Sequence, residues 1–254
     1  MASAADRAKG PARTSVWLAG GADRTRRAAQ PAGLDRDKII EATVRLLDAE
    51  GTAKFSMRRL AAELDVTAMS VYWYVDTKDE LLELALDAAF ASLAPPDVSV
   101  AEQWREQLRA LAVAYREMLV RHPWVSAMAG AYLNVGPNSL AFSTAVQQVM
   151  RNTGLPTRGQ MGGLSAVFQF VYGFGTIEGH FIARCAAAGL TQDEYLRDAL
   201  GTMTGDPSLE HFISDSTDFM EEQSRETVEE NRQRDFDYAL ELLVAGIEAM
   251  VARG

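Results

Sequence analysis

The chain has 254 residues, of which 48% are hydrophobic and 24% charged, and its formal net charge is -10 at pH 7. A chain of this length buries roughly 70 to 75% of the surface that its unfolded form exposes, which suffices for one large domain or two small ones. Because no apolar run reaches the length of about 18 residues that crosses a membrane, and the start lacks an apolar signal segment, we expect a cytoplasmic protein that contacts no membrane.

Residues 1–33 differ from the rest of the chain in charge and composition. They carry six basic and two acidic residues, a net charge of +4, whereas the other 221 residues carry 19 basic and 33 acidic residues, a net charge of -14. Alanine, glycine and proline are frequent and no apolar periodicity persists, so the pattern predicts a flexible basic arm. The alternative is a solvated tail without a role.

Residues 34–90 predict a small helical domain. Apolar residues recur at three- and four-residue steps, and short polar residues stand where helices begin. The expected helices span Asp35 to Glu50, Met57 to Leu64, Thr67 to about Tyr74, and Thr77 to about Phe90. The second and third are short and are joined by a tight turn, which is the pattern of a DNA-binding helix-turn-helix.

The sequence YWY, residues 72–74, lies at the end of the third helix. A helix of seven or eight residues presents only one stripe to a core, so at least two of Val71, Tyr72, Trp73 and Tyr74 point outward. A phenol on a rigid ring reaches a phosphate with little loss of side-chain entropy. The three rings alone favour an ordinary aromatic cluster, whereas the preceding SMRR, residues 56–59, and Thr67 favour a DNA-binding surface.

The stretch EGTAKFSMRRLAAELDVTAMSVYWYVDTKDELL, residues 50–82, resembles the DNA-binding signature of the TetR family of bacterial transcriptional repressors. Its Tyr-Trp pair is similar to that of the tetracycline-repressor branch of the family. The resemblance implies a homodimer that binds double-stranded DNA and releases it when a small molecule binds.

The resemblance also assigns roles to individual residues. It implies phosphate contacts from Ser56, Thr67, Tyr72, Tyr74 and Lys78, and positions facing the base edges for Arg58, Ala68, Met69, Ser70 and Trp73.

Chemistry gives these roles unequal weight. Arg58 is the best candidate for reading a base, because a guanidinium donates two hydrogen bonds to guanine, whereas Ala68 and Met69 suit only a thymine methyl or the shape of the groove. Arg59 is interpreted as a solvated neighbour. Since residues 34–90 hold seven basic and twelve acidic residues, the arm is expected to add phosphate contacts through Arg24, Arg26 and Arg27.

Residues 91–254 predict a second, larger helical domain, so the fold class is all-α. Its expected helices run over about Val100 to Arg121, Trp124 to Leu133, Asn138 to Asn152, Arg158 to Ala188, Thr191 to Thr204 and Ser216 to Ala252. Prolines and glycines separate them, and no alternating strand pattern competes.

Aromatic and soft side chains along these helices form either core or a ligand pocket. The family resemblance implies a pocket for a small hydrophobic effector, for which the candidates are Trp104, Trp124, Met128, Phe168, Gln169, Tyr172 and His180. The stretches RHPW and GPNSL are similar to those of repressors that guard antibiotic exporters, which suggests an antibiotic or another natural product as effector.

The last helix also carries an apolar stripe, expected to form the dimer with help from Gly246, where a partner helix could approach closely. The stripe consists of Phe236, Leu240, Leu243, Val244 and Ile247.

Enzymatic and metal signatures are weak. GFGTIEG, residues 173–179, lacks the Gly-Lys-Ser/Thr ending of a phosphate loop, and the three histidines are scattered. Cys185 stands alone, which excludes an intramolecular disulfide and a cysteine-rich zinc site. We therefore expect no enzyme, cofactor or metal. The alternative to a ligand-responsive repressor is an activator, or a regulator controlled by a protein partner.

Overall fold

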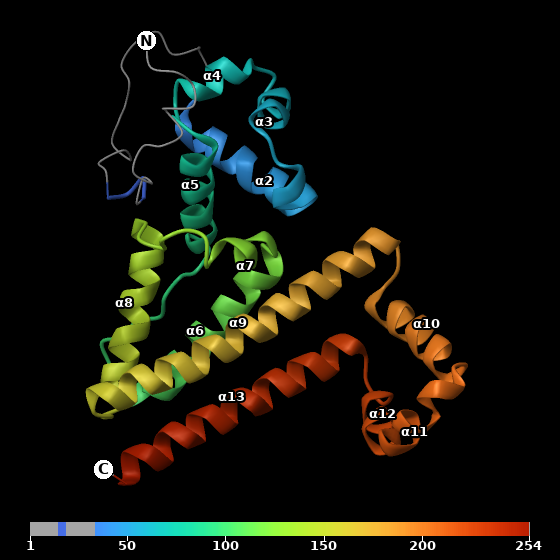
Figure 1. Cartoon of the computed structure of the whole chain (residues 1–254). Coiled ribbons are helices and arrows are strands. Elements are labelled where there is room, and N and C mark those ends of the chain that lie inside the picture. Colours follow the sequence, from blue (N-terminus) through green and yellow to red (C-terminus); the bar gives the residue numbers. More distant parts are fainter. Residues whose placement is uncertain (1–14, 19–33, 254) are drawn as a thin grey trace.

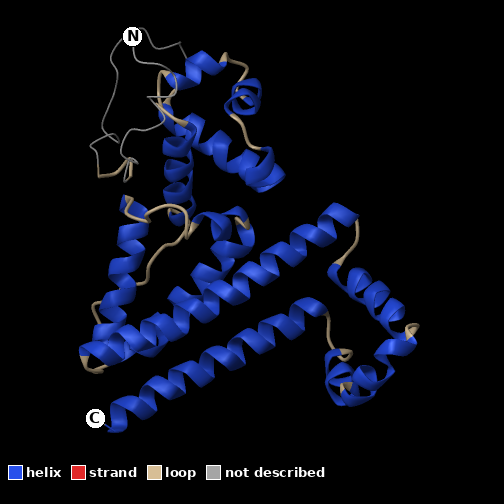
Figure 2. Ribbon diagram, in the orientation of Figure 1, coloured by secondary structure: helices blue, strands red, loops and turns tan. Residues whose placement is uncertain are grey.

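The computed structural model describes residues 15–18 and 34–253. Within these ranges every regular element is a helix (Figures 1 and 2). The helices are α2 (Arg36–Lys54), α3 (Met57–Glu63), α4 (Ala68–Tyr72), α5 (Lys78–Phe90), α6 (Trp104–Arg121), α7 (Trp124–Met128), α8 (Pro137–Asn152), α9 (Thr157–Ala188), α10 (Gln192–Thr204), α11 (Glu210–Asp215), α12 (Thr217–Gln223) and α13 (Val228–Arg253). Single 3-10 turns, Ala101–Gln103 and Pro207–Leu209, precede α6 and α11. None of the described helices is long and apolar enough to span a membrane.

Helices α2 to α5 form a unit at one end of the molecule (Figure 1). The Asp35 side chain caps α2, and at Gly51 the backbone adopts a φ of 73°, which glycine reaches without a steric penalty. The expected stop at Gly51 is therefore a kink, because one more helical turn follows it up to Lys54. Ile39, Leu47 and neighbouring apolar side chains of α2 are buried in the core.

Helix α5 connects this unit to the other helices. Its residues from Glu80 to Asp87 are all buried, since α2 packs on one side and α8 on another. The carboxylate of Asp87 accepts hydrogen bonds from the backbone N–H of Ser139 (2.9 Å) and Asn138 (3.3 Å) in the first turn of α8. An acceptor at this position satisfies N–H groups that have no partner within the helix. The two units are thus joined through α5.

Helices α6, α8, α9 and α13 build the second core, in which α6 packs along α9. A buried ion pair fixes these two helices, with Arg116 Nε and Nη2 at 2.6 and 2.9 Å from the carboxylate oxygens of Glu178. The guanidinium also lies over the Phe236 ring, 4.5 Å from its centroid. Arg116 Nη1 also donates to Gln233 Oε1 (2.9 Å), so the buried guanidinium has the partners that a buried charge requires.

The predicted final helix, Ser216 to Ala252, is wrong because the structure divides it. Helix α12 ends at Gln223 and α13 starts at Val228. Between them Thr227 restarts the helix: Glu230 N donates to Thr227 Oγ1 (3.2 Å), and Thr227 N donates to Glu230 Oε2 (2.9 Å). This reciprocal cap satisfies unpaired backbone donors and outweighs the continuous helical pattern.

The apolar stripe expected at a dimer interface lies inside the subunit instead. Phe236, Leu240, Val244 and Ile247 are buried, and the Phe236 ring stacks on Phe170 with centroids 5.5 Å apart. A side chain the size of phenylalanine contributes about 1.5–3 kcal/mol when it is fully buried. The prediction of a dimer interface for this stripe is therefore wrong. Periodicity shows that one face of a helix is apolar, but it does not show which element covers that face.

Candidate nucleic-acid interface and effector pocket

The helix-turn-helix consists of α3, a turn and α4. Ser56 Oγ accepts from Arg59 N (3.2 Å) and Thr67 Oγ1 accepts from Ser70 N (3.2 Å), so both helices begin at the expected caps. Asp65 turns the chain with a φ of 53°, a conformation that aspartate tolerates better than most residues. Val71 is fully buried and anchors α4 on the core of this unit.

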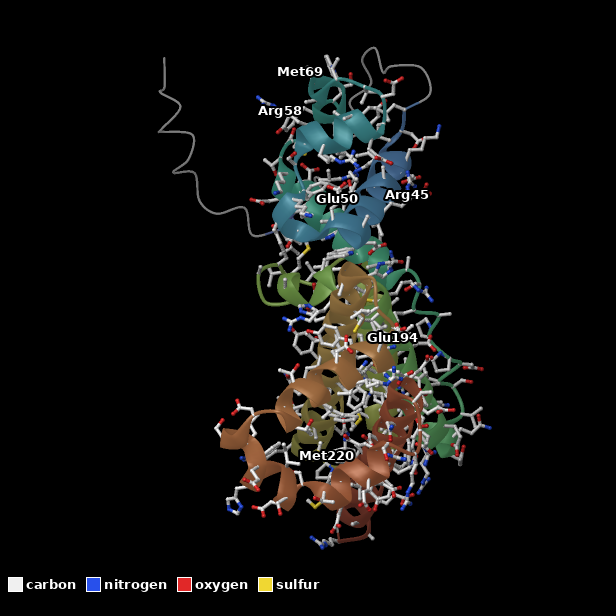
Figure 3. The ribbon with its side chains drawn as sticks, turned by 90° about the vertical axis from the view of Figure 1, so that its right-hand side faces the viewer. Arg45, Glu50, Arg58, Met69, Glu194 and Met220 are labelled. Atoms are coloured by element: carbon white, nitrogen blue, oxygen red, sulfur yellow. The ribbon has the colours of Figure 1, made fainter. Side chains whose placement is uncertain are left out.

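The burial of Val71 leaves its neighbours on the surface. Met69 is 68% exposed, Tyr72 39% and Trp73 46%, and Arg58 on α3 is also exposed. Figure 3 places Met69 and Arg58 at the end of the molecule farthest from α12. We call Arg58, Met69, Tyr72 and Trp73 the recognition face. Thr67 is exposed beside it, while Ala68 and Ser70 are partly buried.

The two arginines of α3 have different surroundings. Arg59 pairs with Glu50 (2.8 Å) and Glu63 (3.2 Å), and its hydrogen bond to Glu50 is the main reason that its pKa is raised. Arg58 forms no ion pair within the described part of the chain. Its guanidinium therefore keeps its donors available to an external acceptor.

Tyr74 and Lys78 have partners inside the unit. The Tyr74 hydroxyl donates to the carbonyl oxygen of Leu34 (2.7 Å), and burial followed by the charge of Asp35 raises its pKa. Lys78 Nζ donates to the carbonyl oxygen of Phe55 (2.9 Å). A phosphate would have to compete with these internal acceptors. The predicted contacts Arg24, Arg26 and Arg27 lie outside the described residues.

The second unit has a cavity of about 310 Å³, open to solvent, between α5, α6, α8 and α9. Four aromatic rings line it, one from each helix, and the Phe142 centroid lies 5.5 Å from that of Tyr115, 5.9 Å from that of Phe168 and 6.2 Å from that of Phe90. The other lining residues are Asn134, Ser139, Ser143, Val146, Gln147 and Leu164. We call this the aromatic cavity.

The aromatic cavity has two unpaired polar atoms and no charged side chain. Asn134 Oδ1 and Ser139 Oγ are buried without a hydrogen-bond partner in the described structure, which is costly unless a ligand or water supplies one. Burial raises the pKa of Tyr115 to about 12. No Asp, Glu, Lys or Arg is among the described residues that line the cavity. These features suit an uncharged ligand.

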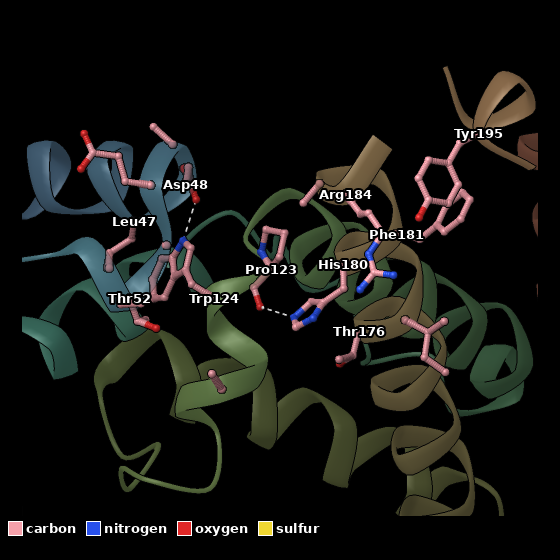
Figure 4. Close-up of a pocket in the computed structure, with 17 residues that line it drawn as sticks. Leu47, Asp48, Thr52, Pro123, Trp124, Thr176, His180, Phe181, Arg184 and Tyr195 are labelled. Carbon is pink, nitrogen blue, oxygen red and sulfur yellow. Dashed lines mark hydrogen bonds between the residues drawn. The ribbon is translucent and has the colours of Figure 1, made fainter. Parts of the chain in front are cut away.

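A larger groove, of about 810 Å³, lies between α2, α7, α9 and α10 (Figure 4). Asp48 accepts hydrogen bonds there from Trp124 Nε1 (2.6 Å) and His122 Nδ1 (2.7 Å). His180 Nε2 lies 3.2 Å from Ser126 Oγ and 3.3 Å from the Pro123 carbonyl oxygen. The two bonds of Asp48 join the two units, whereas His180 contacts only residues of its own unit.

The seven candidate effector residues separate in the structure. Phe168 lines the aromatic cavity, whereas Trp124 and His180 line the groove. Trp104 and Met128 are buried in the core, Gln169 is exposed, and the Tyr172 hydroxyl donates to the Ser126 carbonyl oxygen (2.8 Å). Sequence reasoning did not select most residues of the cavity, because only helix packing brings them together.

Groups of three or more His, Cys, Asp or Glu side chains able to hold a metal ion are absent from the described residues. The described residues that line the aromatic cavity likewise offer no carboxylate, thiolate or imidazole.

Comparison with known proteins gives two family matches. The model "Bacterial regulatory proteins, tetR family" matches residues 39–85, and "Tetracyclin repressor-like, C-terminal domain" matches residues 98–251, more than half of the chain.

The curated relatives are transcriptional regulators. An HTH-type transcriptional regulator of Saccharopolyspora erythraea is 39% identical over 140 residues, which cover 55% of this chain and only 59% of that relative. The HTH-type transcriptional repressor DrrR1 of Streptomyces coeruleorubidus is 29% identical over 221 residues, covering 87% of this chain and 79% of DrrR1.

A solved structure shares the fold. It is the protein ActR of Streptomyces coelicolor in complex with (S)-DNPA, with a TM-score of 0.59 and 26% identity, covering 86% of this chain and 98% of ActR.

Proposed function

This chain belongs to the TetR family of bacterial regulatory proteins, and we propose that it is a sequence-specific transcriptional repressor that leaves its DNA operator when a small effector fills the aromatic cavity. The observation that supports DNA binding is the exposure of the recognition face. The division into an arm (1–33), a DNA-binding domain (34–90) and an effector and dimerisation domain (91–254) belongs to the same proposal, as does action in the cytoplasm. No enzymatic activity is proposed, in line with relatives that are named regulators.

On DNA, the recognition face enters the major groove. Arg58 donates to guanine O6 and N7, Met69 and Ala68 contact a thymine methyl, and Trp73 lies against the groove wall. Tyr72 and Thr67 hold phosphates from the exposed end and start of α4. Ser70 faces the base edges beside Met69. Ser56, Tyr74 and Lys78 complete the backbone contacts, and the last two exchange their internal acceptors for phosphate oxygens.

The effector is an uncharged aromatic compound. Four rings supply edge and face contacts, while the unpaired Asn134 Oδ1 and Ser139 Oγ receive a hydroxyl or amide group of the ligand. The aromatic cavity is preferred to the larger groove because four aromatic rings line it, whereas Asp48 and Trp124 of the groove are bonded to each other across the two units. Its volume is at the small end of the range for ligand pockets.

The connection between the two sites is α5. Phe90 at the end of α5 lines the aromatic cavity, and Asp87 one turn earlier caps α8, the helix that supplies Phe142 and other lining residues. An effector that favours another position of α5 changes the orientation of the recognition face and lowers operator affinity by its differential affinity for the two conformations.

The acting form is a homodimer, assembled through exposed apolar residues of α9 and α13. These residues are Met161, Ile177, Tyr238, Leu242 and Met250. Exposed apolar residues along two adjacent long helices favour burial against a second copy. A two-fold dimer holds two recognition faces about 34 to 36 Å apart, which matches an inverted repeat.

The test of DNA recognition is selection of bound duplexes from a random library by the full-length protein at about 0.15 M salt. Enrichment of an inverted repeat supports the proposal and supplies the operator. If the folded dimer enriches no motif, the DNA-binding proposal is wrong. A reporter gene behind the enriched operator then separates repression from the alternative, activation.

The test of the aromatic cavity uses two probes of similar shape, neutral 2-naphthol and anionic 2-naphthoate, in calorimetric titrations without DNA. We expect 2-naphthol to bind at least about tenfold more tightly, since the cavity offers the anion no counter-charge. Phe142→Ala should weaken binding, and Phe212→Ala, which changes an exposed ring of α11, should leave it unchanged. Equal binding of both probes, or insensitivity to Phe142→Ala, would contradict this assignment.

A further inference from the structure

We propose that Ser15, Val16 and Trp17 form a clasp on α5, held by Glu83, which positions the N-terminal segment of the chain for DNA binding. The role in DNA binding rests on the function proposed above, whereas the clasp itself rests on contacts within the subunit. In Figure 1, residues 15–18 are the short blue segment beside α5.

The Glu83 carboxylate is the centre of the clasp. Its Oε2 accepts one hydrogen bond from Ser15 Oγ (2.6 Å) and another from Val16 N (2.9 Å), and Trp17 N in turn donates to Ser15 Oγ (3.2 Å). Glu83 is 8% exposed and Ser15 is 1% exposed. A carboxylate buried to this degree needs donors, and residues 15 and 16 supply them from 68 and 67 positions earlier in the chain.

Apolar contacts complete the clasp. Val16 is buried as part of the hydrophobic core, and Trp17 is half-buried and packs against that core. Leu18, the next residue, is exposed, so the buried contact ends there. A functionless solvated tail would have no reason to bury a serine, a valine and an indole in succession.

The chain is held a second time just before α2. The Leu34 carbonyl oxygen accepts the hydrogen bond of the Tyr74 hydroxyl, beside the recognition face. Residues 19–33, which include Arg24, Arg26 and Arg27, therefore have both neighbouring positions fixed on the DNA-binding domain. The clasp and the Tyr74–Leu34 bond thus fix the two positions between which these three arginines stand in the sequence.

Glu83 is thus a positioning residue: it acts on DNA only through the segment that it holds. Its neighbours on α5 hold other elements, since Glu80 accepts from Asp76 N (2.8 Å) and Asp87 caps α8. The clasp is therefore attached to the helix that joins the two units.

The clasp itself is tested by hydrogen exchange of the Val16 and Trp17 amides in the full-length protein. We expect slow exchange in the native chain and fast exchange in Glu83→Ala. Glu117→Ala removes an exposed carboxylate of α6 and should leave both amides slow. Fast exchange in the native chain would overturn the clasp, whatever the DNA measurements show.

The positioning role is tested with a full-length variant that changes no charge: Ser15→Gly, Val16→Ser, Trp17→Gly and Leu18→Ser together. Its control changes four uncharged residues of the same segment, Ala2→Gly, Ser3→Gly, Ala4→Ser and Ala5→Gly. We expect the clasp variant to bind the operator about tenfold more weakly, and its log–log salt slope to flatten by about 0.9 for each phosphate that the arm no longer neutralises. The control should behave as the native protein does.

Hydrogen exchange can confirm the clasp while the clasp variant keeps the operator affinity and the salt slope of the native protein. That combination would overturn the positioning role and leave the clasp a purely structural one. If the native protein itself binds no operator, the proposed function fails and the positioning role fails with it. The hydrogen-exchange result still decides whether residues 15–17 are held by Glu83.

Discussion

Trp124 donates its indole N–H to the carboxylate of Asp48 at 2.6 Å, a bond that joins α7 of the second unit to α2 of the helix-turn-helix unit (Figure 4). The proposed regulation requires the effector to change the orientation of the recognition face. Since this bond joins the two units, its removal is informative for stability and for a test of that proposal.

We predict that Trp124→Phe destabilises the protein by about 1.5–3 kcal/mol, because the indole donor to a charged acceptor is removed while most of the apolar contact is kept. The measurement is urea unfolding followed by circular dichroism. Trp73→Phe is the matched control, since Trp73 is exposed on the recognition face. Equal stability of the two variants would show that the Asp48 bond contributes nothing.

The buried ion pair of Arg116 and Glu178 should be far more sensitive than an exposed one. Glu178→Ala leaves the Arg116 guanidinium buried without its carboxylate, so we predict a loss of about 3–5 kcal/mol in unfolding free energy. Glu241→Ala breaks the exposed pair with Arg109 and should cost at most about 1 kcal/mol. Chemical denaturation measures both, and similar losses would contradict the burial argument.

Because Tyr115 is buried, we predict that the free energy of unfolding falls as the pH rises above 10. Burial raises its folded pKa from 10 to about 12, so its contribution is complete below pH 10 and is lost as pH rises toward 12, because the unfolded chain ionises first. Tyr115→Phe should therefore reduce the fall in unfolding free energy over this window, by up to about 1.4 kcal/mol per pH unit. Tyr238→Phe, which changes an exposed ring, should leave the fall as in the native protein.

Arg58→Ala should weaken operator binding by about 1–3 kcal/mol and relax the preference at one guanine position. Arg45→Ala is the control, because it removes the same charge from an exposed position of α2 away from the recognition face (Figure 3). Fluorescence anisotropy with the selected operator and single-base variants gives both affinity and preference. A uniform loss across all sequences would mean that Arg58 contacts the backbone instead of a base.

The helix-turn-helix was predictable because its signals are local. Ser56, Thr67 and Thr77 each cap a helix through an acceptor that reaches a backbone N–H three residues later, so the sequence alone contains both partners. For the same reason, the burial of Val71 required that other residues of a five-residue helix face outward. The family resemblance and the all-α fold follow from the same local patterns.

Only the tertiary structure shows which helix faces are covered by other elements and which stay exposed. The apolar stripe of α13 is visible in the sequence, yet only the position of α9 shows that Phe236 lies inside the subunit. The aromatic cavity combines rings from four helices, and the clasp joins Ser15 to Glu83 across 68 residues. Periodicity determines which side of a helix is buried, but the partner depends on packing between elements far apart in the chain, and that information is not contained in any local pattern.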